Sequence, residues 1–204
     1  MRNFLKIFSY IFHPVFIPCM ATGCYFYIST GFFSRFEMGL ALFHTILMSL
    51  LLPICIFFML RSMKLMTSSI MVENRAERSA PIFLNIVLLG ILVFFIWEYN
   101  RVYDLKHFIV GYMISYFIVW LTVLGKKKYS IHLLSYSAYA VFVLKSLIDY
   151  HSPITIGLAL LLFFYGCIAS SRLEIKAHTP LELFVGTVIG LLPQLFLWKT
   201  VLPL

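Results

Sequence analysis

Long apolar runs separated by short polar segments define the pattern of this 204-residue chain. Seven such runs approach or reach the ~20 residues that a helix needs to cross a lipid bilayer. They lie at about 9–30, 38–60, 80–97, 106–124, 130–148, 153–170 and 180–200. Because unpaired backbone groups are costly in lipid, and the alternating pattern of a membrane barrel is absent, these runs should be helices. The pattern predicts an all-α, polytopic transmembrane bundle of about seven helices, forming one integral membrane domain over residues 1–204.

The first run has the basic start of a signal peptide, but His13, Pro14 and Pro18 interrupt it and no clear small-residue cleavage site follows. We therefore expect a retained first helix over about 9–30. Near the other end of the chain, Gly186 and Gly190 have the small-xxx-small spacing that allows close packing between helices.

Composition agrees with a membrane protein, since 62% of the residues are hydrophobic and 12% are charged, about half the charged fraction of a soluble domain. The net charge of +8 could indicate nucleic-acid binding. The basic residues, however, cluster in short loops between apolar runs, where topology signals and phosphate ligands are found. We expect membrane lipids as partners and no nucleic acid. The four cysteines lie within or beside apolar runs and show neither metal-ligand pairing nor a disulfide framework.

One polar segment, SRLEIKAHTPLE at 171–182, carries candidate chemistry. Thr179, Pro180 and Glu182 have the spacing of an N-cap, a first helical residue and a capping-box partner. His178 would then precede a helix N-terminus, where N–H groups and the helix dipole favour an anion. A cation at Arg172, a nucleophile at His178 and a carboxylate at Glu182 suit phosphoryl chemistry. A capped helix joined to a polar loop would explain the same residues without a site.

Helix parity brings three polar loops to one side of a seven-helix bundle. These loops hold Arg75 and Arg78; Ser130 and His132; and Arg172, His178 and Glu182. Structural caps would not need to converge in this way, so we expect a shared site. The remaining histidines, His13, His44, His107 and His151, are interpreted as solvated or packing residues. Lys126, Lys127 and Lys128 are interpreted as an anchor for lipid headgroups or for topology, with Lys128 also a candidate phosphate ligand.

The residues at 171–182 resemble the third motif, S-R-x5-H-x3-D, of the type 2 phosphatidic acid phosphatases, relatives of the vanadium haloperoxidases. Ser171, Arg172 and His178 match at the right spacing, and Glu182 replaces the aspartate. Of the family's second motif, P-S-G-H, the chain keeps Ser130 and His132.

The family's first motif, K-x6-R-P, is matched loosely by Arg78 and Pro81, with two residues inserted between them, and Arg75 would substitute for the lysine. The forms E-R-x-x-P and K-x-S-x-H, with Phe12-His13-Pro14 at the entry into the first helix, resemble a divergent bacterial subgroup of the family.

The resemblance implies the helical core of this family and an integral membrane phosphatase for a lipid phosphate or pyrophosphate. His178 would form a phosphohistidine, Glu182 would hold its other ring nitrogen, and His132 would protonate the leaving oxygen and then activate water. The phosphate ligands would be Arg172, Arg78, Arg75, Ser130 and Lys128. Because guanidinium groups supply the positive charge, we expect no metal and no cofactor.

Two other functions fit the same residues. The loose first and second motifs favour a non-catalytic lipid-phosphate-binding or transport protein that retains a basic pocket. A membrane metal or haem protein could use His132, His178, Glu174 and Glu182, but paired histidines at ligand spacing within helices are absent.

Two arguments disagree on sidedness. With Arg75, Arg78 and Arg172 set aside, lysines and arginines number eight on the site's face and five on the other, which favours the cytoplasm. Setting aside the three lysines at 126–128 makes the count five on each face, and bacterial relatives usually work on the outer face of the inner membrane. We therefore expect a bacterial inner-membrane protein whose site faces the periplasm.

Overall fold

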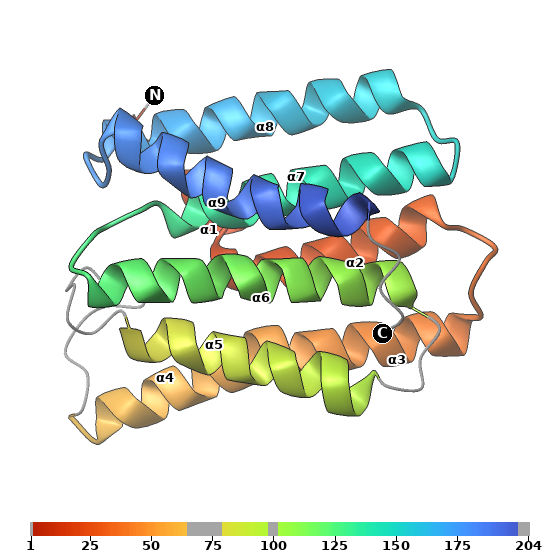
Figure 1. Cartoon of the computed structure of the whole chain (residues 1–204), viewed down its shortest axis with the longest axis horizontal. Coiled ribbons are helices and arrows are strands. Elements are labelled where there is room, and N and C mark those ends of the chain that lie inside the picture. Colours follow the sequence, from red (N-terminus) through yellow and green to blue (C-terminus); the bar gives the residue numbers. More distant parts are fainter. Residues whose placement is uncertain (1, 65–78, 98–101, 200–204) are drawn as a thin grey trace.

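The structure, a computed structural model, describes residues 2–64, 79–97 and 102–199, and all regular elements in these ranges are helices (Figure 1). The first half contains α1 (Arg2–Ile11), the 3-10 turn η1 (Pro14–Phe16), α2 (Ile17–Ile28), α3 (Arg35–Ile46), the π-helical turn η2 (Leu47–Leu51) and α4 (Leu52–Ser62). The second half contains α5 (Ser79–Ile91), the π-helical turn η4 (Leu92–Ile96), α6 (Tyr103–Leu124), α7 (Ile131–Asp149), α8 (Ile154–Glu174) and α9 (Pro180–Lys199).

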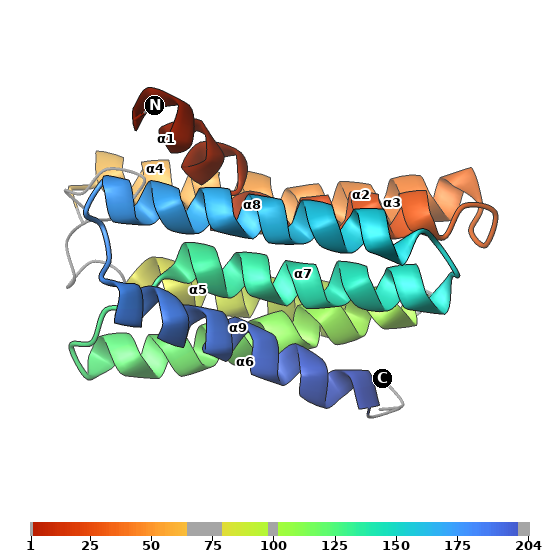
Figure 2. The same cartoon turned by 90° about the horizontal axis from the view of Figure 1, so that it is seen from above.

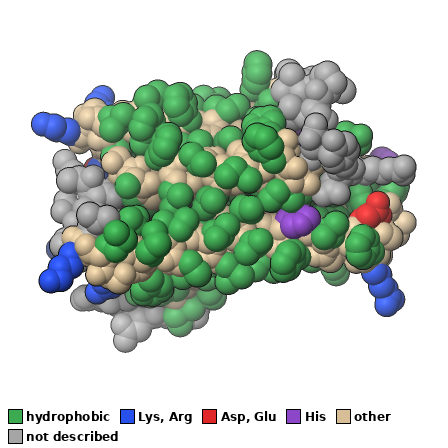
Figure 3. All heavy atoms as spheres, turned by 90° about the horizontal axis from the view of Figure 1, so that it is seen from below, with side chains coloured by type: hydrophobic (Ala, Val, Ile, Leu, Met, Phe, Trp, Pro, Cys, Tyr) green, Lys and Arg blue, Asp and Glu red, His purple; other side chains and the backbone are tan. Residues whose placement is uncertain are grey.

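Six helices within the described residues are long and apolar enough to cross a membrane. They run along one axis of the molecule, and the helix Pro14–Ile28 lies among them but is shorter (Figures 1 and 2). Apolar side chains cover the long face, whereas lysine and arginine side chains lie at its ends (Figure 3). This distribution supports the prediction of a polytopic helical membrane protein, because the apolar face matches lipid and the charged ends match water.

The prediction of one helix over about 9–30 is wrong, because the helix is interrupted at His13. This residue has extended backbone angles, φ −64° and ψ 137°, between α1 and η1. Pro14 is the cause, since its ring disfavours helical angles in the preceding residue and its nitrogen has no hydrogen to donate. As a result α1 departs from the axis shared by the other helices and lies across one end of the bundle (Figure 2).

The helix predicted over about 153–170 is longer than expected and continues to Glu174. Arg172 therefore belongs to α8 and not to the loop after it. The other predicted helices begin and end within a few residues of the observed ones, an ordinary uncertainty for helix ends.

Helix α7 lies at the centre of the bundle, and α9 packs closely against it. A methyl group on Gly186 would lie 2.6 Å from the Ser130 carbonyl oxygen, and one on Gly190 would lie 2.0 Å from that of Leu134. Both distances are far below van der Waals contact, so only glycine fits at either position. The predicted close packing through Gly186 and Gly190 is confirmed, and it brings the start of α9 beside the start of α7.

Candidate functional site at one end of the bundle

The end of α8 turns the chain so that His178 follows Arg172 into one region. Lys176 has a left-handed backbone, φ 53°, and two hydrogen bonds close the helix: Lys176 N–H donates to the Leu173 carbonyl and Ala177 N–H to that of Arg172. This is a Schellman motif. The turn is the local reason why a spacing of six residues brings a helical arginine and a loop histidine together.

A capping box at the start of α9 fixes the ring of His178. The Thr179 N–H donates to Glu182 Oε2 at 3.1 Å, and the Glu182 N–H donates to Thr179 Oγ1 at 3.3 Å. The same Glu182 oxygen lies 3.0 Å from His178 Nδ1. One carboxylate therefore caps the helix and orients the histidine. Because a carboxylate accepts, Nδ1 carries the proton and Nε2 carries the lone pair.

His178 is neutral at physiological pH. Burial, followed by the positive charges of Arg172 and Lys128, lowers its pKa to about 4, although Glu182 acts in the opposite direction. An unprotonated imidazole with its Nε2 lone pair available has the form that nucleophilic attack requires. The side chains of His178 and Arg172 are both buried, which strengthens the electrostatic interaction between them and any anion.

His132 lies in the first turn of α7 and is also buried. Its Nε2 lies 3.2 Å from the backbone carbonyl oxygen of Ser9, so Nε2 carries the proton and Nδ1 remains as the acceptor. Ser9 Oγ in turn lies 2.7 Å from Ser171 Oγ. Helix α1 thus connects the first turn of α7 to the last turns of α8.

His13 is the residue that sequence reasoning missed. Its Nδ1 accepts a hydrogen bond from the Val15 N–H at 3.4 Å, which makes it the N-cap of η1. Its ring lies edge-on to His132, with the two ring centroids 5.3 Å apart. Burial, and secondarily the charge of Arg172, lowers the pKa of His13 to about 4. A histidine directly before a proline was the signal, because such a residue is extended and can cap the following turn.

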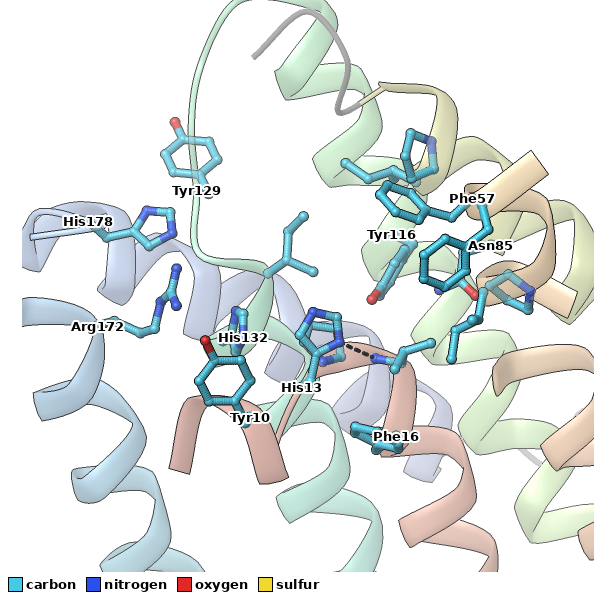
Figure 4. A pocket seen from close by; sticks show the side chains of 18 residues that line it. Tyr10, His13, Phe16, Phe57, Asn85, Tyr116, Tyr129, His132, Arg172 and His178 are labelled. Atoms are coloured by element: carbon cyan, nitrogen blue, oxygen red, sulfur yellow. Dashed lines mark hydrogen bonds between the residues drawn. The ribbon is translucent and has the colours of Figure 1, made fainter. Parts of the chain in front are cut away.

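These side chains meet at a cavity of about 570 Å³. Its polar wall includes Tyr10, His13, Tyr129, His132, Arg172 and His178. Its other wall is mostly apolar and includes Phe16, Pro53, Ile54, Phe57, Phe58 and Ile82. Figure 4 shows Arg172, His132 and His178 grouped on one side, with Phe57 and Asn85 on the other. Among the described residues that line the cavity, Arg172 is the one with a permanent charge, and none is a carboxylate.

The structure thus brings together three predicted site residues, Arg172, His132 and His178, with Glu182 behind the last of them. Ser130 does not line the cavity, because its side chain is buried and accepts a hydrogen bond from Leu133 N–H as the N-cap of α7. Lys128 is half-buried nearby and contributes its charge to His178.

The predicted ligands Arg75 and Arg78 lie outside the described residues. Asn85 lines the cavity, and its side chain hydrogen-bonds to Tyr116, which joins α5 to α6. Gln194 also joins two helices, since its Nε2 donates to the Phe108 carbonyl of α6 at 2.9 Å.

Within residues 2–64, 79–97 and 102–199, no group of three His, Cys, Asp or Glu side chains is placed to hold a metal ion. Comparisons with protein-family models, with curated proteins and with solved structures found no match to this chain. The geometry of the cavity therefore carries the functional argument.

Proposed function

We propose that this chain is an integral membrane phosphatase that hydrolyses a lipid phosphate or pyrophosphate through a phosphohistidine. One observation carries the proposal: His178, with Nδ1 on Glu182 and Nε2 unprotonated, lines the same cavity as Arg172 and His132. This arrangement combines an oriented nucleophile, a fixed cation and a second imidazole. No metal is needed, because the guanidinium of Arg172 can stabilise the charge on the transferring group.

The reaction proceeds in two steps. His178 Nε2 attacks phosphorus while the bond to the leaving oxygen breaks, and Arg172 binds the equatorial oxygens of the transition state. His132, when protonated at Nδ1, gives that proton to the leaving oxygen. It then accepts a proton at Nδ1 from the water that attacks the phosphohistidine, which releases phosphate. Glu182 holds His178 throughout and stabilises the positive charge that develops on the ring.

The two walls of the cavity support a lipid substrate. The polar wall suits a phosphate group, and the aromatic and aliphatic wall from α4 and α5 suits an acyl or prenyl chain. A lipid whose tail remains in the bilayer would present its phosphate at the end of the bundle, where the cavity lies.

The test is phosphate release from a short-chain lipid phosphate by the purified protein in detergent. We expect turnover without added metal and an acid-labile phosphohistidine trapped by rapid quenching. His178→Ala should reduce the rate by at least about 10³-fold, as loss of a nucleophile does. His151→Asn is the matched control: His151 is exposed at the opposite end and has a left-handed backbone, φ 52°, which asparagine tolerates. Binding of the lipid phosphate without any turnover would favour the non-catalytic binding or transport protein.

We further propose that the chain lies in a bacterial inner membrane with this site toward the periplasm. Glu174 is exposed at the same end as the site, at the end of α8. In a background without Cys19, Cys24, Cys55 and Cys167, Glu174→Cys should react with an impermeant thiol reagent once the outer barrier of intact cells is permeabilised. Labelling only after the inner membrane is broken would place the site in the cytoplasm.

A further inference from the structure

The three histidines of the cavity differ in which ring nitrogen the protein uses. His178 donates from Nδ1 to Glu182, and His132 donates from Nε2 to the Ser9 carbonyl. Each neutral ring therefore keeps a lone pair on its other nitrogen. His13 is the opposite case, because its Nδ1 accepts from the Val15 N–H. In its neutral form the proton must then be on Nε2.

The position of His13 is fixed by the chain around it. Pro14 sets the extended backbone of His13, and the Pro14 carbonyl accepts a hydrogen bond from the buried hydroxyl of Tyr112 at 3.1 Å. The His132 ring packs against it edge-on at an interplanar angle of 89°. These contacts restrain the ring of His13 on the cavity wall, and Figure 4 shows it between the His132 side and the Asn85 side of the cavity.

We propose that His13 is a further phosphate ligand, whose Nε2–H donates to an oxygen of the phosphoryl group bound beside Arg172. The two other imidazoles present lone pairs, one for attack and one for proton transfer, and neither can donate to the phosphate while neutral. His13 supplies that donor without adding a charge, since burial and Arg172 keep its ring neutral. The identity of the bound group as phosphate rests on the proposed function, whereas the donor role of His13 can be tested on its own.

The alternative is that His13 serves only as the N-cap of η1. Two substitutions separate these roles, because asparagine and glutamine each reproduce one of the two ring nitrogens. His13→Asn keeps an acceptor near the position of Nδ1 and so keeps the cap. His13→Gln keeps a donor near the position of Nε2 and loses the cap.

The experiment measures binding of inorganic phosphate to the full-length protein in detergent by calorimetry, together with the thermal midpoint. We expect His13→Asn to retain the midpoint and to weaken phosphate binding about tenfold or more, the usual effect of losing a hydrogen bond to a charged group. We expect His13→Gln to lower the midpoint and to bind phosphate within about threefold of the unmodified protein. His151→Asn should change neither quantity. Full phosphate affinity in His13→Asn would overturn the proposal.

A second measurement does not depend on how the glutamine variant folds. In protein labelled with nitrogen-15 histidine, saturating phosphate should shift the protonated Nε2 signal of His13, assigned by its loss in His13→Asn. An unchanged signal at saturation overturns the proposal. If phosphate binds with this dependence on His13 while lipid phosphates are not hydrolysed, the ligand assignment stands and the hydrolase fails.

Discussion

The two ends of the bundle treat charge in opposite ways. At the end opposite to the cavity, the Lys145 ammonium lies 2.8 Å from Asp104 and also pairs with Asp149, one helical turn away. The Tyr25 hydroxyl lies 3.1 Å from that of Tyr150 beside this network. At the cavity end, a buried arginine lines the same cavity as three imidazoles, and the Glu182 carboxylate contacts Nδ1 of His178.

The difference indicates what each end is for. A lysine between two carboxylates satisfies its charge within the protein and joins α6 to α7. The cavity has a permanent cation and neutral imidazoles on its wall in a partly apolar space, where an anion is stabilised strongly. Ion pairs between helices hold the structure together, whereas a buried cation on a cavity wall favours a ligand of opposite sign.

Among the substitutions that compare the two ends, the largest effect is expected from Glu182→Gln, which removes the negative charge beside Nδ1 of His178. The rate of phosphate release should fall on the order of 10²–10⁴-fold, because the amide no longer stabilises the charge that develops on the ring. Glu182 raises the pKa of His178 against burial, so the acid limb of the pH–rate profile should move to lower pH. Thr179→Ala removes the other half of the capping box and serves as the control, with a loss of about 1 kcal/mol in stability and a nearly unchanged rate. A full rate in Glu182→Gln would remove this carboxylate from the mechanism.

A smaller effect concerns acid stability, measured as the thermal midpoint between pH 7 and pH 4. Because His13 and His178 have pKa values of about 4 in the folded protein and about 6.5 when unfolded, the unfolded state binds more protons in this interval. Stability should therefore fall as the pH drops from 6.5 to 4 and level off below 4. The variant with both His13→Gln and His178→Gln should lose less of its midpoint over the same interval. Equal losses in both proteins would contradict the neutral state of these rings.

The smallest effect is expected at the opposite end. Lys145→Met breaks the ion pairs to Asp104 and Asp149, and because all three side chains are partly exposed the loss should be about 1 kcal/mol. The rate constant and the KM of phosphate release should stay within about twofold, since the network lies far from the cavity. Adding Asp104→Asn should recover part of the loss. A large fall in rate would show that the two ends are coupled.

Much of the site could be predicted from short-range patterns. The spacing of Arg172, His178 and Glu182 follows from two local motifs, a helix C-terminus and a capping box, and both depend on neighbours within six residues. One oxygen of Glu182 serves both the cap and the histidine, so the two roles do not compete.

What the sequence did not predict depends on contacts between distant segments. The Ser9 carbonyl that fixes His132 lies 123 positions away along the chain, and no local pattern indicates such a partner. The apolar run around His13 favours a continuous helix, whereas the proline that follows His13 interrupts it. The cost of a proline within a helix predicts the break at His13. It does not predict the contact between the His13 and His132 rings.

Hydrogen bonds between distant segments at the cavity end also constrain the order of events during biosynthesis. Ser9 in the first helix bonds to Ser171 and His132, and Ser130 donates its N–H to the Glu182 carbonyl. A nascent chain that ends before α9 contains His178 but lacks Glu182, and the α7 surface that Gly186 and Gly190 cover is still bare. The proposed chemistry can therefore begin only after the helix that supplies the nucleophile's partner has been inserted. Membrane lipids therefore cannot react at this site before α9 is in place.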